Sequence, residues 1–214
     1  MKYKTIVLDY NGTLVDDVDL CYELLNKLLM LSKHPTVTRE RYLEIFHFPI
    51  RDYYIDAGFD FSEGKDDYDH LAKIFTKDYL TRYPECNLFP DVLSTLENLH
   101  GKVEILVLSA TDSKSLENEL KHYGIYKYLN DFIGITGFRI NSKLKEAQDY
   151  FEKHPHKMDE VLFVGDTDHD AEVAKALGGK VALISRGHQN EQRLKKANPD
   201  YIYPDLKSVL EELF

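Results

Sequence analysis

Residues 161–179 read VLFVGDTDHDAEVAKALGG, a stretch in which two apolar runs flank a helical pattern. Its apolar opening, Val161–Val164, is typical of a strand that is buried on both faces of a parallel sheet. Asp168–Leu177 then has the spacing of a helix, and two glycines follow where a helix would end. A second short apolar run, Val181–Ile184, comes next. A strand, a helix and a strand in this order predict one unit of a parallel α/β sheet.

The same alternation covers the chain from Pro90 onward, and the apolar run within Tyr3–Asp9 adds one more strand at the N-terminus. We therefore predict an α/β fold with a doubly wound parallel sheet. The other predicted helices are Asp91–Leu99, Ser113–Tyr123, Ser142–His154, Gln189–Ala197 and Asp205–Leu213, and the other predicted strands are Val103–Leu108, Asp131–Ile135 and Tyr201–Tyr203.

The stretch from Val15 to about Tyr83 has a different pattern. Leu20, Leu24 and Leu28 recur every four residues, which is a helical period, and we predict no strand in this stretch. Prolines and a glycine divide it into three or four helices. The sequence thus predicts an all-helical cap, residues 16–83, inserted into a core made of residues 1–15 and 84–214.

Composition narrows the class of protein. The chain has 214 residues, of which 43% are hydrophobic and 30% charged, so it can form a core without disulfides. Its net charge of −10 disfavours broad binding to nucleic acid or to an anionic membrane surface. Two cysteines, Cys21 and Cys86, make neither a disulfide framework nor a zinc site. Asp9 comes too early for a signal-peptide core, and no apolar run approaches the roughly 20 residues that span a bilayer. We expect a cytoplasmic monomer or weak dimer.

Polar residues gather at the ends of the predicted strands. Asp9 and Asn11 follow the first strand, Ser109 the second, and Asp166 the strand that begins at Val161. The carboxyl ends of parallel strands form the ligand-binding edge of such a sheet. A single aspartate there has an ordinary alternative role as a helix cap. Several buried carboxylates on one edge, however, repel each other unless a cation lies between them. The pattern therefore favours Mg²⁺ and an anionic, phosphorylated substrate.

Four segments then point to a family. These are LDYNGTLVDD at residues 8–17, VLSATD at 107–112, NSKLKEA at 141–147 and the stretch at 161–179. Their order and spacing resemble the haloacid dehalogenase superfamily, most closely the branch of phosphoglycolate phosphatases and β-phosphoglucomutase-like enzymes. The resemblance covers nearly the whole chain. It implies a Rossmann-like core with a helical cap, and a Mg²⁺-dependent phosphatase that acts on a small phosphorylated metabolite.

The resemblance also implies roles for individual residues. Asp9 matches the nucleophile that becomes an aspartyl-phosphate, and it would give one oxygen to Mg²⁺. The backbone carbonyl of Asn11 would be a second metal ligand. The hydroxyl of Ser109, helped by the amide of Ala110, would bind a phosphate oxygen.

Three further roles fall in the second half of the chain. Lys143 matches the lysine that neutralises charge between phosphate and nucleophile, with Lys145 as the alternative. Asp166 matches the second metal carboxylate. Asp170 matches the outer acid that orients a metal-bound water or the lysine.

One position departs from the family pattern. Related phosphatases and mutases have Asp-x-Asp, whereas this chain reads Asp9-Tyr10-Asn11. The second aspartate normally protonates the leaving oxygen, and an amide cannot donate and regain a proton as a carboxyl does. General acid–base catalysis is typically worth about 10²- to 10⁴-fold. Either the enzyme is slow on alkyl phosphates, or its substrate has a good leaving group, or another residue supplies the proton.

Asn11 also keeps other functions open. The chain could be a catalytically weak or inactive member that binds a phosphate ligand or a protein partner, or a phosphoglucomutase-like enzyme. In the predicted cap, the loop around His47 and Arg51 falls where related caps project substrate-reading residues. Arg51 could bind a carboxylate or a second phosphate, although a solvated surface arginine is the favoured alternative.

Overall fold

The computed structural model describes residues 2–135 and 143–214, and its centre is a six-stranded parallel sheet. The strand order is β5-β4-β1-β6-β7-β8, so β1 lies between two neighbours that come much later in the chain. Every residue of β1 is buried, as its continuous apolar run predicted. The strands are β1 (Thr5–Leu8), β4 (Glu104–Asp112), β5 (Asp131–Ile135), β6 (Val161–Gly165), β7 (Lys180–Ile184) and β8 (Tyr201–Tyr203).

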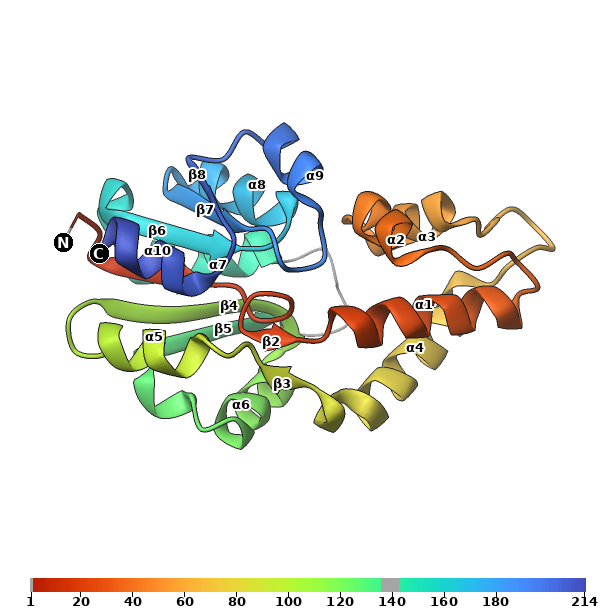
Figure 1. The fold of residues 1–214 in the computed structure, drawn as a ribbon, viewed down its shortest axis with the longest axis horizontal. Coiled ribbons are helices and arrows are strands. Elements are labelled where there is room, and N and C mark those ends of the chain that lie inside the picture. The colour runs from red at the N-terminus through yellow and green to blue at the C-terminus, as the bar shows by residue number, and fades with distance from the viewer. Residues whose placement is uncertain (1, 136–142) are drawn as a thin grey trace.

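Helices cover both faces of this sheet, as Figure 1 shows. Alternate residues of β1 point to opposite faces: Ile6 and Leu8 pack into one apolar cluster, and Val7 into the other. The first cluster takes in α5 (Val92–Leu99), α6 (Ser113–His122) and α10 (Leu206–Leu213), and the second takes in α7 (Lys143–Lys153), α8 (Asp168–Leu177) and α9 (Glu191–Lys196). The predicted doubly wound α/β fold is confirmed.

The helices between β1 and the rest of the sheet lie together at one end of the molecule (Figure 1). They share an apolar cluster of their own, which contains Leu25, Tyr42, Tyr53 and Leu71. These helices are α1 (Val18–Leu31), α2 (Arg39–Ile45), α3 (Ile50–Ala57) and α4 (Tyr68–Arg82). A separate core of this kind supports the predicted division into core and cap, whose boundaries stay a prediction.

A short ribbon joins the two parts. β2 (Val15–Asp16) pairs antiparallel with β3 (Asn87–Leu88), outside the main sheet. The expectation of no strand from Val15 onward is therefore wrong at its first two residues. Two residues carry no periodic signal, and their partner lies some seventy positions later in the chain. The chain passes between core and cap twice, once at β2 and once near β3, and these two strands pair with each other.

Most predicted elements end within two residues of those observed, and the largest difference concerns β4. It continues past the predicted end at Leu108 to Asp112, with an irregular register between these residues. Ser109 therefore lies inside the strand rather than after it. Ser142, the predicted first residue of α7, lies outside the described residues. The remaining short helical turns are η1 (Tyr83–Glu85), η2 (Tyr126–Tyr128) and η3 (Met158–Glu160).

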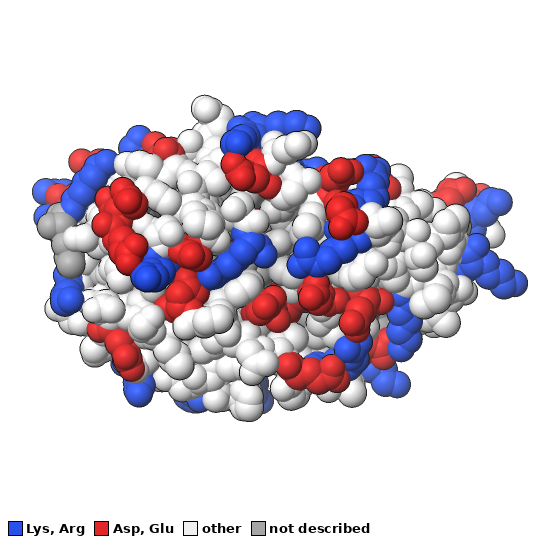
Figure 2. Space-filling view, in the orientation of Figure 1, with Lys and Arg blue, Asp and Glu red and all other residues white. Residues whose placement is uncertain are grey.

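The surface is charged and mixed. Acidic and basic side chains are interspersed over the face in Figure 2. No helix in the described part of the chain has both the length and the apolar character needed to span a bilayer. Cys21 and Cys86 are free thiols.

Candidate active site

Asp9 and Asp166 meet because their strands are parallel neighbours. Leu8 of β1 pairs in register with Val164 of β6, and the Asp9 amide donates to the Val164 carbonyl at 2.8 Å. Asp170 lies one turn into α8, which follows β6 directly. Carboxylate oxygens of Asp9, Asp166 and Asp170 lie within 4.8 Å of one another. The structure thus brings together the three acids that the sequence placed at this edge.

Lys143 lies among these carboxylates. Its Nζ is 2.5 Å from Oδ1 of Asp9 and 2.6 Å from Oδ1 of Asp170, and its side chain is only 6% exposed. Lys145 points elsewhere, since it is exposed and pairs with Asp149 on the same helix. Of the two candidate lysines, the geometry selects Lys143.

The charges of these groups favour binding of a cation between them. Burial, together with Asp170 and Asp166, raises the pKa of Asp9 well above its ordinary value in spite of Lys143. Burial also raises the pKa of Asp166. Burial would raise the pKa of Asp170 too, but Lys143 outweighs it and lowers the value. Three carboxylates and one ammonium leave two excess negative charges, which one divalent cation would cancel. The residues present therefore fit a hard divalent ion.

Asp166 is held by several fixed donors. The backbone amide of His188 donates to its Oδ2 at 2.6 Å, and the Thr13 hydroxyl donates to its Oδ1 at 3.1 Å. Gly12 and Gly187 leave room for the carboxylate, because a Cβ on either residue would overlap it. Packing of this kind fixes the direction of a metal ligand.

Asp170 is fixed by the start of its own helix. The Thr167 amide and hydroxyl donate to its Oδ2 at 3.0 and 2.8 Å, and the two residues form a capping box. One carboxylate oxygen thus caps the helix while the other accepts from Lys143. Asp170 is therefore placed to orient the lysine.

Ser109 and Ala110 lie across the site on β4. Ser109 is buried, and its Oγ accepts from the Thr111 amide at 3.1 Å. A cavity of about 200 Å³ is lined by Ser109 and Ala110 together with Asp9, Lys143 and Asp166. The sequence-predicted phosphate-binding residues therefore face the same space as the acids and the lysine.

Comparison with known proteins places the chain in a family. Residues 6–184 match the family model described as haloacid dehalogenase-like hydrolase. The chain belongs to this family. It is 26% identical over 225 residues to the phosphoglycolate phosphatase of Vibrio parahaemolyticus, covering 97% of this chain and 95% of that protein.

Two solved structures share the fold of this haloacid dehalogenase-like hydrolase. One is a haloacid dehalogenase-like family hydrolase from Streptococcus pneumoniae, with a TM-score of 0.84 and 19% identity over 100% of this chain and 99% of that one. The other is a predicted phosphoglycolate phosphatase from Haemophilus somnus, with a TM-score of 0.75 and 21% identity over 99% and 98% of the two chains. The predicted family and enzyme class, a phosphatase of the haloacid dehalogenase-like type, are confirmed.

Asn11, where this family member departs from the pattern, belongs to a partly buried hydrogen-bond network. Its Nδ2 donates to Oδ2 of Asp17 at 3.0 Å and to the Tyr79 hydroxyl at 2.7 Å. Its Oδ1 accepts from the Thr111 hydroxyl at 3.3 Å. Tyr79 belongs to α4, so the Asn11 side chain links the sheet edge that carries Asp9, Asp166 and Asp170, the proposed catalytic edge, to the helices of the predicted cap.

Sequence reasoning missed a second polar group, made of Asp17, His188 and Tyr79. His188 Nε2 lies 3.2 Å from Oδ1 of Asp17, and its Nδ1 lies 2.7 Å from the Tyr42 hydroxyl. Burial would lower the pKa of His188, but Asp17 outweighs it and raises the value to about 9. His188 follows β7, so the strand-end rule that found Asp9 would have found it too. No local signal marks Tyr79.

The cap loop reaches the site through apolar residues rather than through its charges. Phe48 and Ile50 line the 200 Å³ cavity, and His47 and Arg51 do not. His47 Nε2 lies 3.2 Å from Oδ2 of Asp56, and the Arg51 guanidinium lies 5.2 Å from the centre of the Phe61 ring. The geometry gives no support to Arg51 as a substrate-binding cation.

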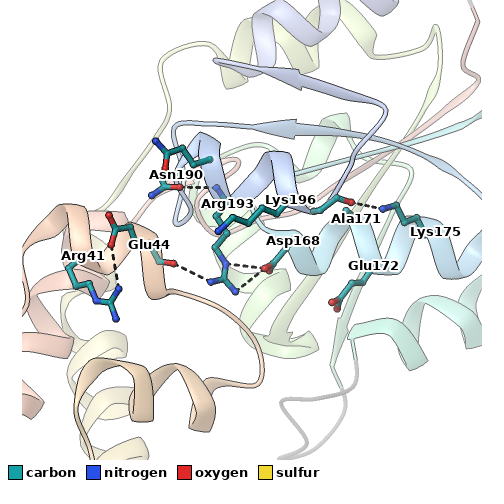
Figure 3. Close-up of a pocket in the computed structure, with 11 residues that line it drawn as sticks. Arg41, Glu44, Asp168, Ala171, Glu172, Lys175, Asn190, Arg193 and Lys196 are labelled. Atoms are coloured by element: carbon teal, nitrogen blue, oxygen red, sulfur yellow. Dashed lines mark hydrogen bonds and ion pairs between the residues drawn. The ribbon is translucent and has the colours of Figure 1, made fainter.

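A larger cavity of about 620 Å³ lies on another side of the core–cap junction, between α2, α8 and α9 (Figure 3). None of the acids of the catalytic edge lines it. Its main feature is Arg193, which donates to Oδ2 of Asp168 at 3.0 Å and to the Glu44 carbonyl of α2 at 3.1 Å. Nearby, the Gln189 side chain donates to the Phe46 carbonyl, and the Asn190 amide donates to the Leu43 carbonyl. The loop after β7 and the first turn of α9 therefore bind the C-terminal end of α2.

Proposed function

We propose that this chain is a Mg²⁺-dependent phosphatase that hydrolyses a small phosphorylated metabolite through an aspartyl-phosphate at Asp9. The observation that carries the proposal is the Lys143 ammonium, which bridges Asp9 and Asp170 inside a buried group of three carboxylates. The positive charges near Asp166, on Lys143 and His188, are already paired with other carboxylates of the chain.

The proposed reaction has two steps. An Asp9 carboxylate oxygen attacks phosphorus, and the bond to the ester oxygen breaks, with the electron pair leaving on that oxygen. Water then attacks the aspartyl-phosphate, which releases inorganic phosphate and restores Asp9. Ser109 and the Ala110 amide would bind phosphate oxygens throughout, while Lys143 balances the negative charge between nucleophile and phosphate.

Mg²⁺ would be held by Asp9, Asp166 and the Asn11 backbone carbonyl. Asp170 would orient Lys143 or a metal-bound water. When bound, it supplies positive charge that neutralises phosphate oxygens. The chain's own contribution is the fixed geometry around Asp166, set by His188, Thr13 and the two glycines.

The relatives suggest a first substrate to test. Phosphoglycolate phosphatases resemble this chain over nearly its full length, so 2-phosphoglycolate belongs in the assay panel. Asn11 favours a second candidate, a weak or inactive member that binds phosphate ligands without turnover. A mutase would need an acid at position 11 even more, because it moves protons in both directions.

The test is phosphate release from a panel of phosphate esters, with and without Mg²⁺. We expect wild-type turnover that EDTA abolishes, and a loss of at least about 100-fold in Asp9→Asn and Lys143→Met. Lys145→Met is the matched control, because that exposed lysine should keep activity within about twofold. Phosphate binding without release from any ester would instead support the inactive member. A cytoplasmic location and a monomer or weak dimer complete the proposal.

A further inference from the structure

The 200 Å³ cavity beside Asp9 continues from the catalytic edge into the cap. A second cavity of about 230 Å³ lies within the cap helices, and it shares Cys21, Phe46, Phe48, Ile50, Phe75 and Ala110 with the first as lining residues. Two spaces with six common wall residues adjoin each other. Ala110, one of these residues, also stands beside the proposed phosphate position.

The walls of the second space, which we call the cap chamber, are mainly aromatic. Tyr53 and Tyr54 of α3 and Tyr68 of α4 line it beyond the shared phenylalanines. Rings in this cluster pack edge to face. The ring centres of Phe46 and Tyr53 are 5.1 Å apart, and those of Tyr53 and Tyr54 are 5.5 Å apart. Such walls favour another ring by area burial and by ring geometry. An apolar cavity of about 150 Å³ holds a benzene molecule, so the cap chamber has room for one aromatic group.

We propose that the cap chamber binds an aromatic group on the leaving alcohol, so that the substrates are phosphate monoesters bearing an aromatic ring. This inference rests on the proposed phosphatase function and names the substrate class of the same site. Phosphate would lie against Lys143 and Ser109, and the ring would extend between Phe46 and Phe75 into the cap.

A small anionic leaving group fits these walls poorly. The carboxylate of glycolate would need a cation or several donors once it leaves water. Among the described residues that line the two cavities, the cationic side chains are Lys143 and His188. Both already pair with carboxylates of the chain, Lys143 with Asp9 and Asp170, and His188 with Asp17.

The chemistry of Asn11 leads to the same class of ester. When the phosphorus–oxygen bond of an aryl ester breaks, the electron pair stays on a phenolic oxygen, whose pKa is about 10. Solvent water can protonate this phenolate after it leaves. An alkoxide is far more basic and needs its proton during bond breaking, which an amide at position 11 cannot supply.

The experiment separates ring binding from leaving-group chemistry. Phosphate release is measured for benzyl phosphate and ethyl phosphate, which are both esters of alkyl alcohols and differ mainly in the ring. We expect kcat/KM for benzyl phosphate to exceed that for ethyl phosphate by about tenfold or more. Phenyl phosphate and 2-phosphoglycolate complete the set, with phenyl phosphate expected to be the fastest.

Variants on α4 test where the ring lies. Ala72 and Thr76 both line the cap chamber, and Ala72→Leu or Thr76→Leu should fill it and bring the benzyl-to-ethyl ratio close to one. Lys73→Leu adds the same side chain at an exposed neighbouring position outside the lining and should keep the ratio. Circular dichroism shows whether each variant folds.

The possible failures can be told apart. A wild-type ratio near one, or faster turnover of 2-phosphoglycolate than of the aromatic esters, overturns this inference while leaving an Asp9-dependent phosphatase in place. A ratio that survives both filling variants also overturns it. Absence of phosphate release from every ester, or release that persists in Asp9→Asn, overturns the proposed function itself.

Discussion

At the scale of the residue, position 11 decides how the leaving group is treated. The Asn11 amide donates to the Asp17 carboxylate at 3.0 Å, so a carboxyl at this position would face another acid. Repulsion between the two would raise the pKa of the introduced group and keep it protonated. A protonated carboxyl beside the leaving oxygen is what a general acid requires.

The first prediction follows from this contact. Asn11→Asp should raise the rate on ethyl phosphate by about tenfold or more, and should change the rate on phenyl phosphate little. A plot of log rate against leaving-group pKa should therefore be flatter than in the wild type. Asn11→Ala, which removes the amide without adding an acid, should not flatten it. Equal slopes for wild type and Asn11→Asp would show that the proton does not come from position 11.

A second residue-scale prediction concerns Gly187. A methyl group there would overlap Oδ2 and Cβ of Asp166, so Gly187→Ala should displace the proposed metal ligand. We expect the Mg²⁺ concentration for half-maximal activity to rise by about tenfold or more. Gly101→Ala is the control: its Cβ meets open space, although its φ of +74° makes the change mildly destabilising. Unchanged Mg²⁺ dependence in Gly187→Ala would contradict the assignment of Asp166.

At the scale of the element, the loop after β7 and the start of α9 hold the cap against the core. Residues 189–193 supply hydrogen bonds to three carbonyls at the C-terminal end of α2, a helix end that otherwise leaves such groups unpaired. Arg193 also pairs with Asp168, which lies two residues after Asp166. The contact between core and cap is thus built beside the proposed metal site.

Arg193→Met should weaken this contact. The pair is partly exposed, so we expect a loss of about 1 kcal/mol, or about three- to tenfold in the population of the closed cap. Hydrogen exchange of the α2 amides should speed up by that factor, and KM should rise. Lys196→Met, which changes another lining residue of the same cavity, is the matched control. Equal α2 exchange in both variants would show that Arg193 does not hold the cap.

At the scale of the whole molecule, stability should depend on the protonation of one carboxyl that is not among the proposed metal ligands. Burial raises the pKa of Glu119 on α6 to about 7, against an ordinary value of 4.5. The folded state therefore holds a proton that the unfolded chain releases. Stability from this group is full below about pH 4.5, falls as the pH rises, and reaches its lowest level above about pH 7.

Glu119→Gln should remove this penalty, because the amide stays neutral at every pH. We expect a gain of about 1–2 kcal/mol in unfolding free energy at pH 8, after allowing for partial exposure, and little gain at pH 4.5. Urea unfolding at the two pH values measures it. Glu117→Gln, on the exposed side of the same helix, should show no such pH-dependent gain. A gain of equal size at both pH values would mean that the ionisation of Glu119 is not its cause.

The sequence by itself determined most of the elements and which polar residues follow the central strands. Apolar runs and helical periods are local patterns, so they predict where strands and helices lie and where they end. Because parallel strands end at one edge, Asp9 and Asp166 could be placed together before any contact was known. The same argument placed Ser109 at this edge, and the family motifs then supplied its phosphate-binding role together with Lys143 and Asp170. Asn11 could be recognised as a departure because the same motifs have an aspartate at that position.

Only the tertiary structure decided how side chains distant in sequence meet. Lys143 and Lys145 are equivalent in the sequence, and the orientation of α7 against the sheet separates them. The Asp17–His188 pair joins residues 171 positions apart, and no local pattern records such a contact. The cap chamber likewise arises where the cap helices pack against one another, and the Arg193 contact arises where core and cap meet. Periodicity encodes which face of an element is buried, whereas packing between elements decides what that face touches.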